Sequence, residues 1–216
     1  MRLRIALGLL AALWLLPPLL PIAQWPLKHF HREWLAAALA LAACVLWLPL
    51  RGQPITLPRS ALYLLALALY VPLQGLVTNT PYAQPAIGYA LYLVWAALLL
   101  TAAAGLRERL GAKPVISAIC WAALVSALLA GAVGAMQAFG VPDWLTYVVQ
   151  QENDSRVRGN LQHASYYADQ ILMGVVAAVF LFATRAINAW LLILALAILG
   201  FAVALAGSRL TVLVLC

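Results

Sequence analysis

Residues 190–206, WLLILALAILGFAVALA, decide the fold of this chain, because they form a long run without a single charged side chain. A helix needs about 20 predominantly apolar residues to cross the hydrocarbon core of a bilayer. The run is longer than the roughly 10 residues of a membrane barrel strand, and it shows no sustained alternation of apolar and polar residues. We therefore predict a transmembrane helix here.

The rest of the chain repeats this pattern. Apolar residues make up 66% of the 216 residues, charged residues only 9%, and the mean hydropathy is +0.98. This composition excludes a soluble domain with a hydrated surface. We predict an all-α, polytopic transmembrane helix bundle with about seven complete spans. The other six spans are expected at 3–23, 34–50, 61–77, 86–104, 115–139 and 167–183.

Both ends of the chain carry unusual apolar runs. The run at 3–23 follows a basic start, as a signal peptide does, but it lacks a convincing small-residue cleavage site. We predict a retained span, which Pro17, Pro18 and Pro21 kink or end. The final run, LTVLVLC at 210–216, has about a third of the length needed to cross. We expect it to begin a truncated eighth span, in the N-terminal part of a longer protein.

One long polar segment, QQENDSRVRGNLQHASYYAD at 150–169, interrupts the apolar runs. It divides the chain into an N-terminal bundle of five spans at 1–149, a polar loop at 150–169, and the start of a second transmembrane region at 170–216. Because almost everything around it is apolar, we expect the chemistry of the protein in this loop.

The positive charges predict the orientation, because loops rich in Lys and Arg tend to stay cytoplasmic. With a cytoplasmic N-terminus, five basic residues lie outside: Lys28, Arg32, Arg156, Arg158 and Arg209. Eight lie inside: Arg2, Arg4, Arg51, Arg59, Arg107, Arg109, Lys113 and Arg185. The polar loop is then periplasmic or extracellular. The net charge of +7 reflects topology and contact with anionic lipids, and nucleic-acid binding is excluded as a function.

The polar loop offers two arginines for anion binding. Arg156 and Arg158 flank one residue and precede Gly159 and Asn160, so guanidinium groups and flexible backbone amides occur together. Guanidinium forks suit phosphate and diphosphate oxygens, particularly near a membrane surface. An equally good interpretation is that the arginines pair with acidic residues and hold the loop closed, the candidates being Asp143, Glu152 and Asp154.

Five other polar residues are further candidates. His163 has the chemistry of a base or a hydrogen-bond partner, although most single loop histidines are neither. Asp169 suits a helix start, and Arg209 either reaches the interface or lines a polar cavity. The pair His29 and His31 fits an interfacial belt better than a metal site. We predict no metal site, since Cys44, Cys120 and Cys216 read as small core residues.

Three blocks, in order, resemble the O-antigen ligase superfamily, in the version typical of bacterial protein O-oligosaccharyltransferases of the pilin-glycosylation type. RVRGNLQHASYYADQILMG at 156–174 resembles its Gly-Asn-Leu-x-Gln-Pro-Asn-His-x-Ala motif through Gly159, Asn160, Leu161 and Ala168. LKHFHREWLAAALAL at 27–41 resembles its Phe-x-x-Glu-Trp-Leu-Ala signature through Phe30, Glu33, Trp34, Leu35 and Ala36. AGSRLTVL at 206–213 resembles its Ser-Arg block through Ser208 and Arg209.

Weaker similarity at 73–100 extends the resemblance over nearly the whole chain. The chain departs from the motif where the family has Gln-Pro-Asn-His, because it reads His163, Ala164, Ser165 and Tyr166 there; His163 stands at the Gln position, and Tyr166 replaces the usual His. A role cannot therefore be transferred directly to His163, and the donor or acceptor is expected to differ from that of the family.

The resemblance implies an oligosaccharyl ligase that moves a glycan from undecaprenyl diphosphate to an acceptor at the periplasmic face of the bacterial inner membrane. The acceptor is a protein Ser or Thr or the lipid A core, and the reaction uses no nucleotide sugar, cofactor or metal. Arg156, Arg158, Asn160, His163 and Arg209 would bind the substrate. The catalytic histidine would lie beyond Cys216, so we expect these 216 residues to be inactive alone.

Three alternatives remain open at this point. An O-antigen polymerase of the same superfamily uses the same kind of donor. A transporter or flippase for a lipid or small solute would share the polytopic architecture, but the charged residues occur in loops rather than at mid-membrane and no internal repeat is visible. A nonfunctional remnant of a ligase would keep the same polar blocks.

Overall fold

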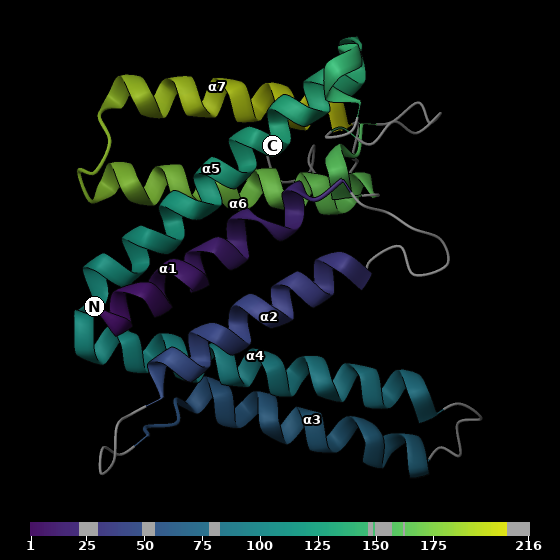
Figure 1. Ribbon diagram of the computed structural model, residues 1–216, viewed down its shortest axis with the longest axis vertical. Coiled ribbons are helices and arrows are strands. Elements are labelled where there is room, and N and C mark those ends of the chain that lie inside the picture. Colours follow the sequence, from purple (N-terminus) through teal and green to yellow (C-terminus); the bar gives the residue numbers. More distant parts are fainter. Residues whose placement is uncertain are drawn as a thin grey trace. The chain divides into compact units, whose positions relative to one another are not determined.

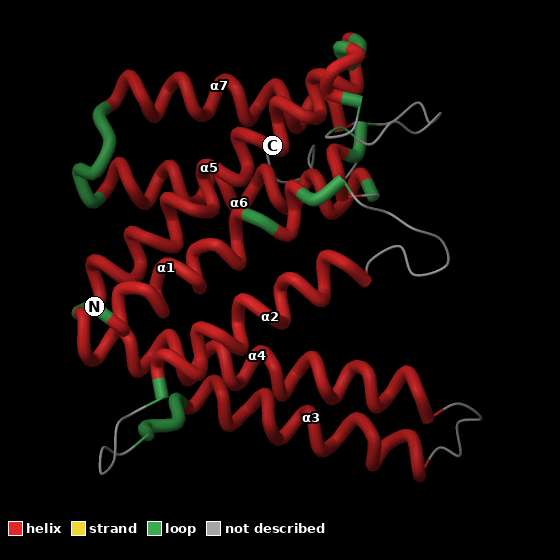
Figure 2. Tube along the Cα trace, viewed as in Figure 1, coloured by secondary structure: helices red, strands yellow, loops and turns green. Residues whose placement is uncertain are grey.

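Each of the seven predicted apolar runs overlaps one α-helix in the computed structural model of the protein (Figures 1 and 2). The structure describes residues 1–21, 30–48, 55–77, 83–146, 149, 157–161 and 163–206. Within these ranges the regular secondary structure consists of α-helices and short 3-10 helices, with no strand. The α-helices are α1 Arg2–Leu15, α2 Phe30–Trp47, α3 Arg59–Val77, α4 Ala83–Leu110, α5 Ala112–Phe139, α6 Ala164–Ala183 and α7 Ala189–Ala206.

Five of these helical segments are long and apolar enough to cross a membrane, as expected of a multi-pass helical membrane protein. They are Arg2–Leu19, Pro85–Leu110, Ala112–Phe139, Ala164–Ala183 and Ala189–Ala206. α2 and α3 are helical where spans were predicted but are not among the five. The predicted eighth span, at 210–216, lies outside the described residues.

The helix ends follow local chemistry. α1 ends at Leu15, and its prolines continue as the 3-10 helix η1, Pro17–Leu19, which confirms the predicted end. α4 and α5 are separated by Gly111 alone, whose φ of +90° suits glycine and turns the chain. At the start of α7, the side chain of Asn188 accepts a hydrogen bond from the backbone N–H of Leu191 at 2.9 Å.

The chain forms two compact units, each built from two segments. Unit 1 consists of Met1–Leu7 and Ala40–Val115, and unit 2 of Gly8–Leu39 and Ile116–Cys216. In unit 1, α3 and α4 pack side by side as a hairpin (Figure 1). Large apolar side chains on both helices face outward, for example Leu69 and Leu91, as expected of a surface in contact with lipid.

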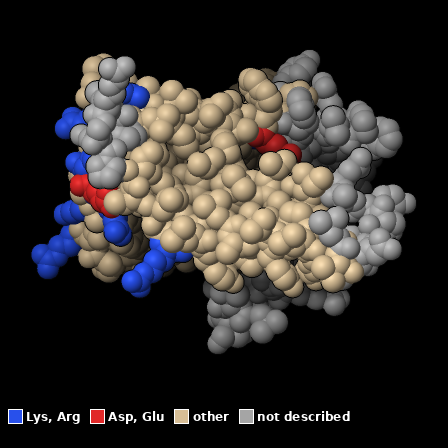
Figure 3. All heavy atoms as spheres, turned by 90° about the horizontal axis from the view of Figure 1, so that it is seen from below, with Lys and Arg blue, Asp and Glu red and all other residues tan. Residues whose placement is uncertain are grey.

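The basic residues of unit 1 gather at one end of the α3–α4 hairpin. Arg2 donates from Nη2 to the carbonyl oxygen of Val45 at 2.8 Å, and Arg109 donates from Nη1 to that of Trp47 at 3.4 Å. Cations at the C-terminal end of α2 complement its exposed carbonyls and its helix dipole. Figure 3 shows Lys and Arg gathered along one edge of the face in view, next to a largely uncharged surface.

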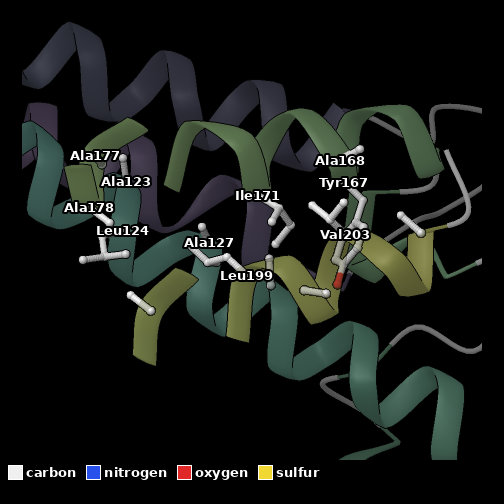
Figure 4. Packing of buried hydrophobic residues seen from close by; sticks show 14 of the residues in the cluster. Ala123, Leu124, Ala127, Tyr167, Ala168, Ile171, Ala177, Ala178, Leu199 and Val203 are labelled. Atoms are coloured by element: carbon white, nitrogen blue, oxygen red, sulfur yellow. The ribbon is translucent and has the colours of Figure 1, made fainter. Parts of the chain in front are cut away.

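The core of unit 2 is made by α5, α6 and α7 (Figure 4). Small residues let the helices approach closely: a Cβ on Gly131 of α5 would lie 3.2 Å from Cβ of Ala202 in α7. A Cβ on Gly174 of α6 would overlap Ala127 of α5. α6 and α7 form the hairpin that carries the candidate site at the N-terminal end of α6.

Candidate functional site

The predicted site residues fall into two groups. Arg158, Asn160 and His163 are described and lie just before α6. Arg156 and Arg209 lie outside the described residues. The alternative of ion pairs that close the loop also stays a prediction, because Glu152 and Asp154 and the side chain of Asp143 are not described.

The Gly-Asn-Leu triplet of the motif forms one turn of 3-10 helix, η3, Gly159–Leu161. Gly159 has a φ of +56°, a conformation that only glycine adopts without strain. A Cβ at this position would lie 2.8 Å from Cδ2 of Tyr167, so the ring of Tyr167 also needs the space. Both facts explain why glycine opens the triplet.

Gln137, in the last turn of α5, makes two hydrogen bonds to the backbone at the start of this turn. Its Nε2 donates to the carbonyl oxygen of Gly159 at 2.8 Å, and its Oε1 accepts from the backbone N–H of Arg158 at 3.3 Å. One side-chain amide therefore satisfies a donor and an acceptor of the motif backbone. Sequence reasoning missed Gln137, which appeared only as a polar residue near the end of an apolar run.

Asn160 is buried, with 3% of its surface exposed, and its Nδ2 donates to the carbonyl oxygen of Leu19 at 2.9 Å. Arg32, in the first turn of α2, donates from Nε to the next carbonyl, that of Leu20, at 3.1 Å. Two neighbouring carbonyls after the prolines thus accept hydrogen bonds from η3 and from α2. The cluster joins three segments of unit 2 that lie far apart in the sequence.

Arg32 is the most unusual charge in this cluster. Only 7% of its surface is exposed, and Nη2 has no hydrogen-bond partner among the residues that the structure describes. Arg32 precedes the predicted second span, and burial lowers the pKa of its guanidinium below the ordinary value for arginine. Arginine nevertheless remains protonated in proteins, so Arg32 is a buried cation. It was predicted only as a topogenic charge outside the membrane.

Tyr167 is the second residue that sequence reasoning missed, because it counted only as the first residue of an apolar run. The side chain is fully buried in the core of unit 2 (Figure 4). Its ring lies against Gly159, and a Cβ on Gly134 of α5 would lie 2.7 Å from Cζ of Tyr167. Its hydroxyl has no hydrogen-bond partner within the described ranges. Tyr167 therefore supports η3 by packing against Gly159, and its hydroxyl makes no hydrogen bond to a described residue.

His163 and Asp169 lie on the outer side of this region. α6 begins at Ala164, three residues before the predicted start, so His163 is its N-cap residue and Asp169 lies within the helix. Both side chains are exposed. The imidazole of His163 packs edge-on against Tyr166 with ring centroids 5.3 Å apart, and its side chain does not cap the helix. An exposed imidazole remains available for proton transfer.

The described residues contain no group of three or more His, Cys, Asp or Glu side chains that could hold a metal ion. A hollow of about 580 Å³ lies at the other end of α6, in the turn to α7. It is lined by Phe182, Ala183, Arg185, Ala186, Ile187 and Asn188. None of the sequence-predicted site residues lines this hollow.

Comparisons with known proteins give no relative for this geometry: no protein-family model, no characterised protein and no solved structure matches the chain. The functional argument therefore depends on the polar cluster and on the three sequence blocks.

Proposed function

We propose that the chain forms the membrane scaffold and part of the donor site of an oligosaccharyl ligase of the O-antigen ligase superfamily. The enzyme would transfer a glycan from undecaprenyl diphosphate to a hydroxyl group of a protein or of the lipid A core. The site would lie at the periplasmic face of the bacterial inner membrane, with the N-terminus in the cytoplasm. Seven membrane spans belong to this proposal.

One observation carries the proposal: two of the three blocks meet in space. Arg32 lies in the block at 27–41, Asn160 lies in the block at 156–174, and their side chains bind the adjacent carbonyls of Leu20 and Leu19. Two blocks that lie far apart in the sequence thus contribute to a single buried cluster. A shared site is a physical reason for both blocks to occur in one chain.

The charges fit the chemistry of the donor. Transfer from a lipid diphosphate leaves negative charge on the departing diphosphate, and fixed donors near a low-dielectric surface stabilise such charge strongly. Two arginines belong to this region of unit 2: Arg32 donates to the carbonyl of Leu20, and Arg158 directly precedes η3, where its backbone N–H donates to Gln137. The exposed His163 supplies a group that can exchange a proton with an acceptor.

The arrangement of unit 2 fits the predicted orientation. Arg158 precedes α6, and Arg185 follows it. The 20 residues of α6 make a helix about 30 Å long, which matches the hydrocarbon thickness. A membrane-spanning α6 would place the two arginines at opposite faces of a membrane, as the proposed orientation requires.

The test measures glycan transfer by the complete gene product in a bacterial strain that lacks its own ligase. The unaltered protein should produce glycosylated acceptor, and Arg158→Gln should reduce the product about 10- to 100-fold, because one charge-assisted contact to the diphosphate is lost. Arg107→Gln, an exposed arginine of α4, is the matched control and should leave transfer unchanged.

The form of the product separates the alternatives. A ladder of lengthened donor glycans without glycosylated acceptor would identify a polymerase. Movement of lipid-linked glycan across the membrane, with no new glycosidic bond, would identify a flippase and overturn the ligase proposal.

A further inference from the structure

The buried guanidinium of Arg32 is the starting point. Its Nε donates to the carbonyl oxygen of Leu20 at 3.1 Å, which fixes the plane of the group. Its Nη2 is buried and makes no hydrogen bond to any described residue. A guanidinium has five N–H donors and no acceptor, so one carbonyl leaves most of its capacity unused.

A carbonyl partner does not neutralise the charge. Transfer of a cation out of water is costly unless an anion or several acceptors compensate, and buried charges are therefore normally paired. The described carboxylates do not provide this partner. Glu33 and Asp169 have exposed side chains, and Glu108 accepts hydrogen bonds from Thr56 in unit 1. None of them forms an ion pair with Arg32.

The surroundings favour a phosphoryl group. Arg32 lies in the first turn of α2, next to the exposed Trp34, which is a typical anchor at the membrane interface. The depth of an interface is also where lipid phosphates lie. The planar fork of arginine matches the oxygens of phosphate and diphosphate, and it gains strength where water is excluded.

We propose that Arg32 binds a phosphoryl group of a membrane lipid through its unused guanidinium edge, and that this lipid is the polyprenyl diphosphate of the glycan donor. The carbonyl of Leu20 orients the guanidinium from behind. Asn160, in the turn that follows Arg158, donates to the adjacent carbonyl of Leu19 and so ties η3 to the segment that Arg32 also contacts. The identity of the lipid rests on the proposed function; the phosphoryl site itself rests on the burial and geometry of Arg32.

The test is a binding titration with the full 216-residue chain purified in detergent, read as the rise of the unfolding temperature with ligand. The ligands are undecaprenyl diphosphate, undecaprenol without phosphate, and phosphatidylglycerol. Undecaprenyl diphosphate should raise the unfolding temperature and undecaprenol should not. Arg32→Gln should weaken the binding of undecaprenyl diphosphate roughly 10- to 100-fold, and Arg107→Gln should bind like the unaltered protein.

A second variant covers the case in which Arg32→Gln does not fold. Arg32→Lys keeps a positive charge but loses the fork, and it should bind at least severalfold more weakly than the unaltered protein. Inorganic pyrophosphate should compete with the lipid on the unaltered protein. Equal binding by the unaltered protein and by every folded Arg32 variant would overturn the inference.

The remaining outcomes separate this inference from the proposed function. If the unaltered protein binds undecaprenyl diphosphate but Arg32 has no effect, the inference fails and the ligase proposal stands. If phosphatidylglycerol binds in an Arg32-dependent way and undecaprenyl diphosphate does not, the phosphoryl site stands, and its assignment to the donor and the ligase proposal fail together. If neither lipid binds, the phosphoryl site is wrong, and the transfer assay alone decides the ligase proposal.

Discussion

Arg2 and Arg32 make the same kind of hydrogen bond in two different settings. Arg2, in unit 1, is exposed and donates to the carbonyl of Val45, whereas Arg32, in unit 2, is buried and donates to the carbonyl of Leu20. Water can satisfy the remaining donors of Arg2, but it cannot reach most of the guanidinium of Arg32. The comparison teaches that arginine at the basic end of unit 1 is a tolerant surface feature, whereas the buried arginine of unit 2 has donors that no described residue satisfies.

The packing of glycines should also differ between the two units, and this difference should have the largest effect on the free energy of unfolding. Gly134→Ala in unit 2 would push a methyl group into Tyr167 and Val157, and we expect a loss of about 1–3 kcal/mol of unfolding free energy. Gly88→Ala in unit 1 meets nothing within 4 Å, and it should be neutral or stabilising by up to about 1 kcal/mol. Equilibrium unfolding in mixed detergent micelles measures both values; equal stability of the two variants would contradict the close packing of Tyr167.

The second-largest difference should be in the contribution of hydrogen bonds to stability in the two units. Asn160→Ala removes a buried donor and leaves the carbonyl of Leu19 without it, so we expect a cost of about 1–2 kcal/mol. Thr56→Ala removes an exposed hydrogen bond to Glu108 and should cost less than about 0.5 kcal/mol. The same unfolding measurement applies, and a larger cost for Thr56→Ala than for Asn160→Ala would reverse the comparison.

A smaller effect than that of Asn160→Ala should come from the basic end of unit 1. Arg109→Gln removes the donor to the carbonyl of Trp47 at the end of α2, and we expect a cost of about 0.3–1 kcal/mol at low salt. Added salt should reduce this cost, because screening weakens charge effects near water. Unfolding at low and at high ionic strength measures it, with Asn160→Ala as the comparison whose cost should stay constant. A cost for Arg109→Gln that does not depend on salt would show that the contact is buried.

The fold was largely predictable because seven apolar runs are long enough to specify helices without any tertiary information. The errors occur at helix ends with polar residues: α4 continues through Arg107, Glu108 and Arg109, and α6 starts at Ala164. Charged residues such as Arg and Glu are good helix formers once a helix has begun. A helix can therefore extend several residues beyond the apolar run that predicts it.

The candidate site was predictable only in part. Gly159 and Asn160 attracted attention by residue type, but the burial of Asn160 depends on η1, which lies far away in the sequence. Arg32, Gln137 and Tyr167 were missed for the same reason. Their roles arise from packing between elements, and a local pattern carries no information about such contacts.

The hydrogen bond between Asn160 and Leu19 also constrains when the polar cluster can assemble during synthesis, because it joins residues 141 positions apart. At a synthesis rate of about 5–20 residues per second, the carbonyl of Leu19 waits on the order of 10 s before its partner is translated. During this interval Arg32 of α2 can already donate to Leu20, but the donor from η3, Asn160, is missing, and the polar cluster is incomplete. Completion of the cluster is therefore a late event in biogenesis, and it can occur only after α5 has been made and the turn before α6 has followed it.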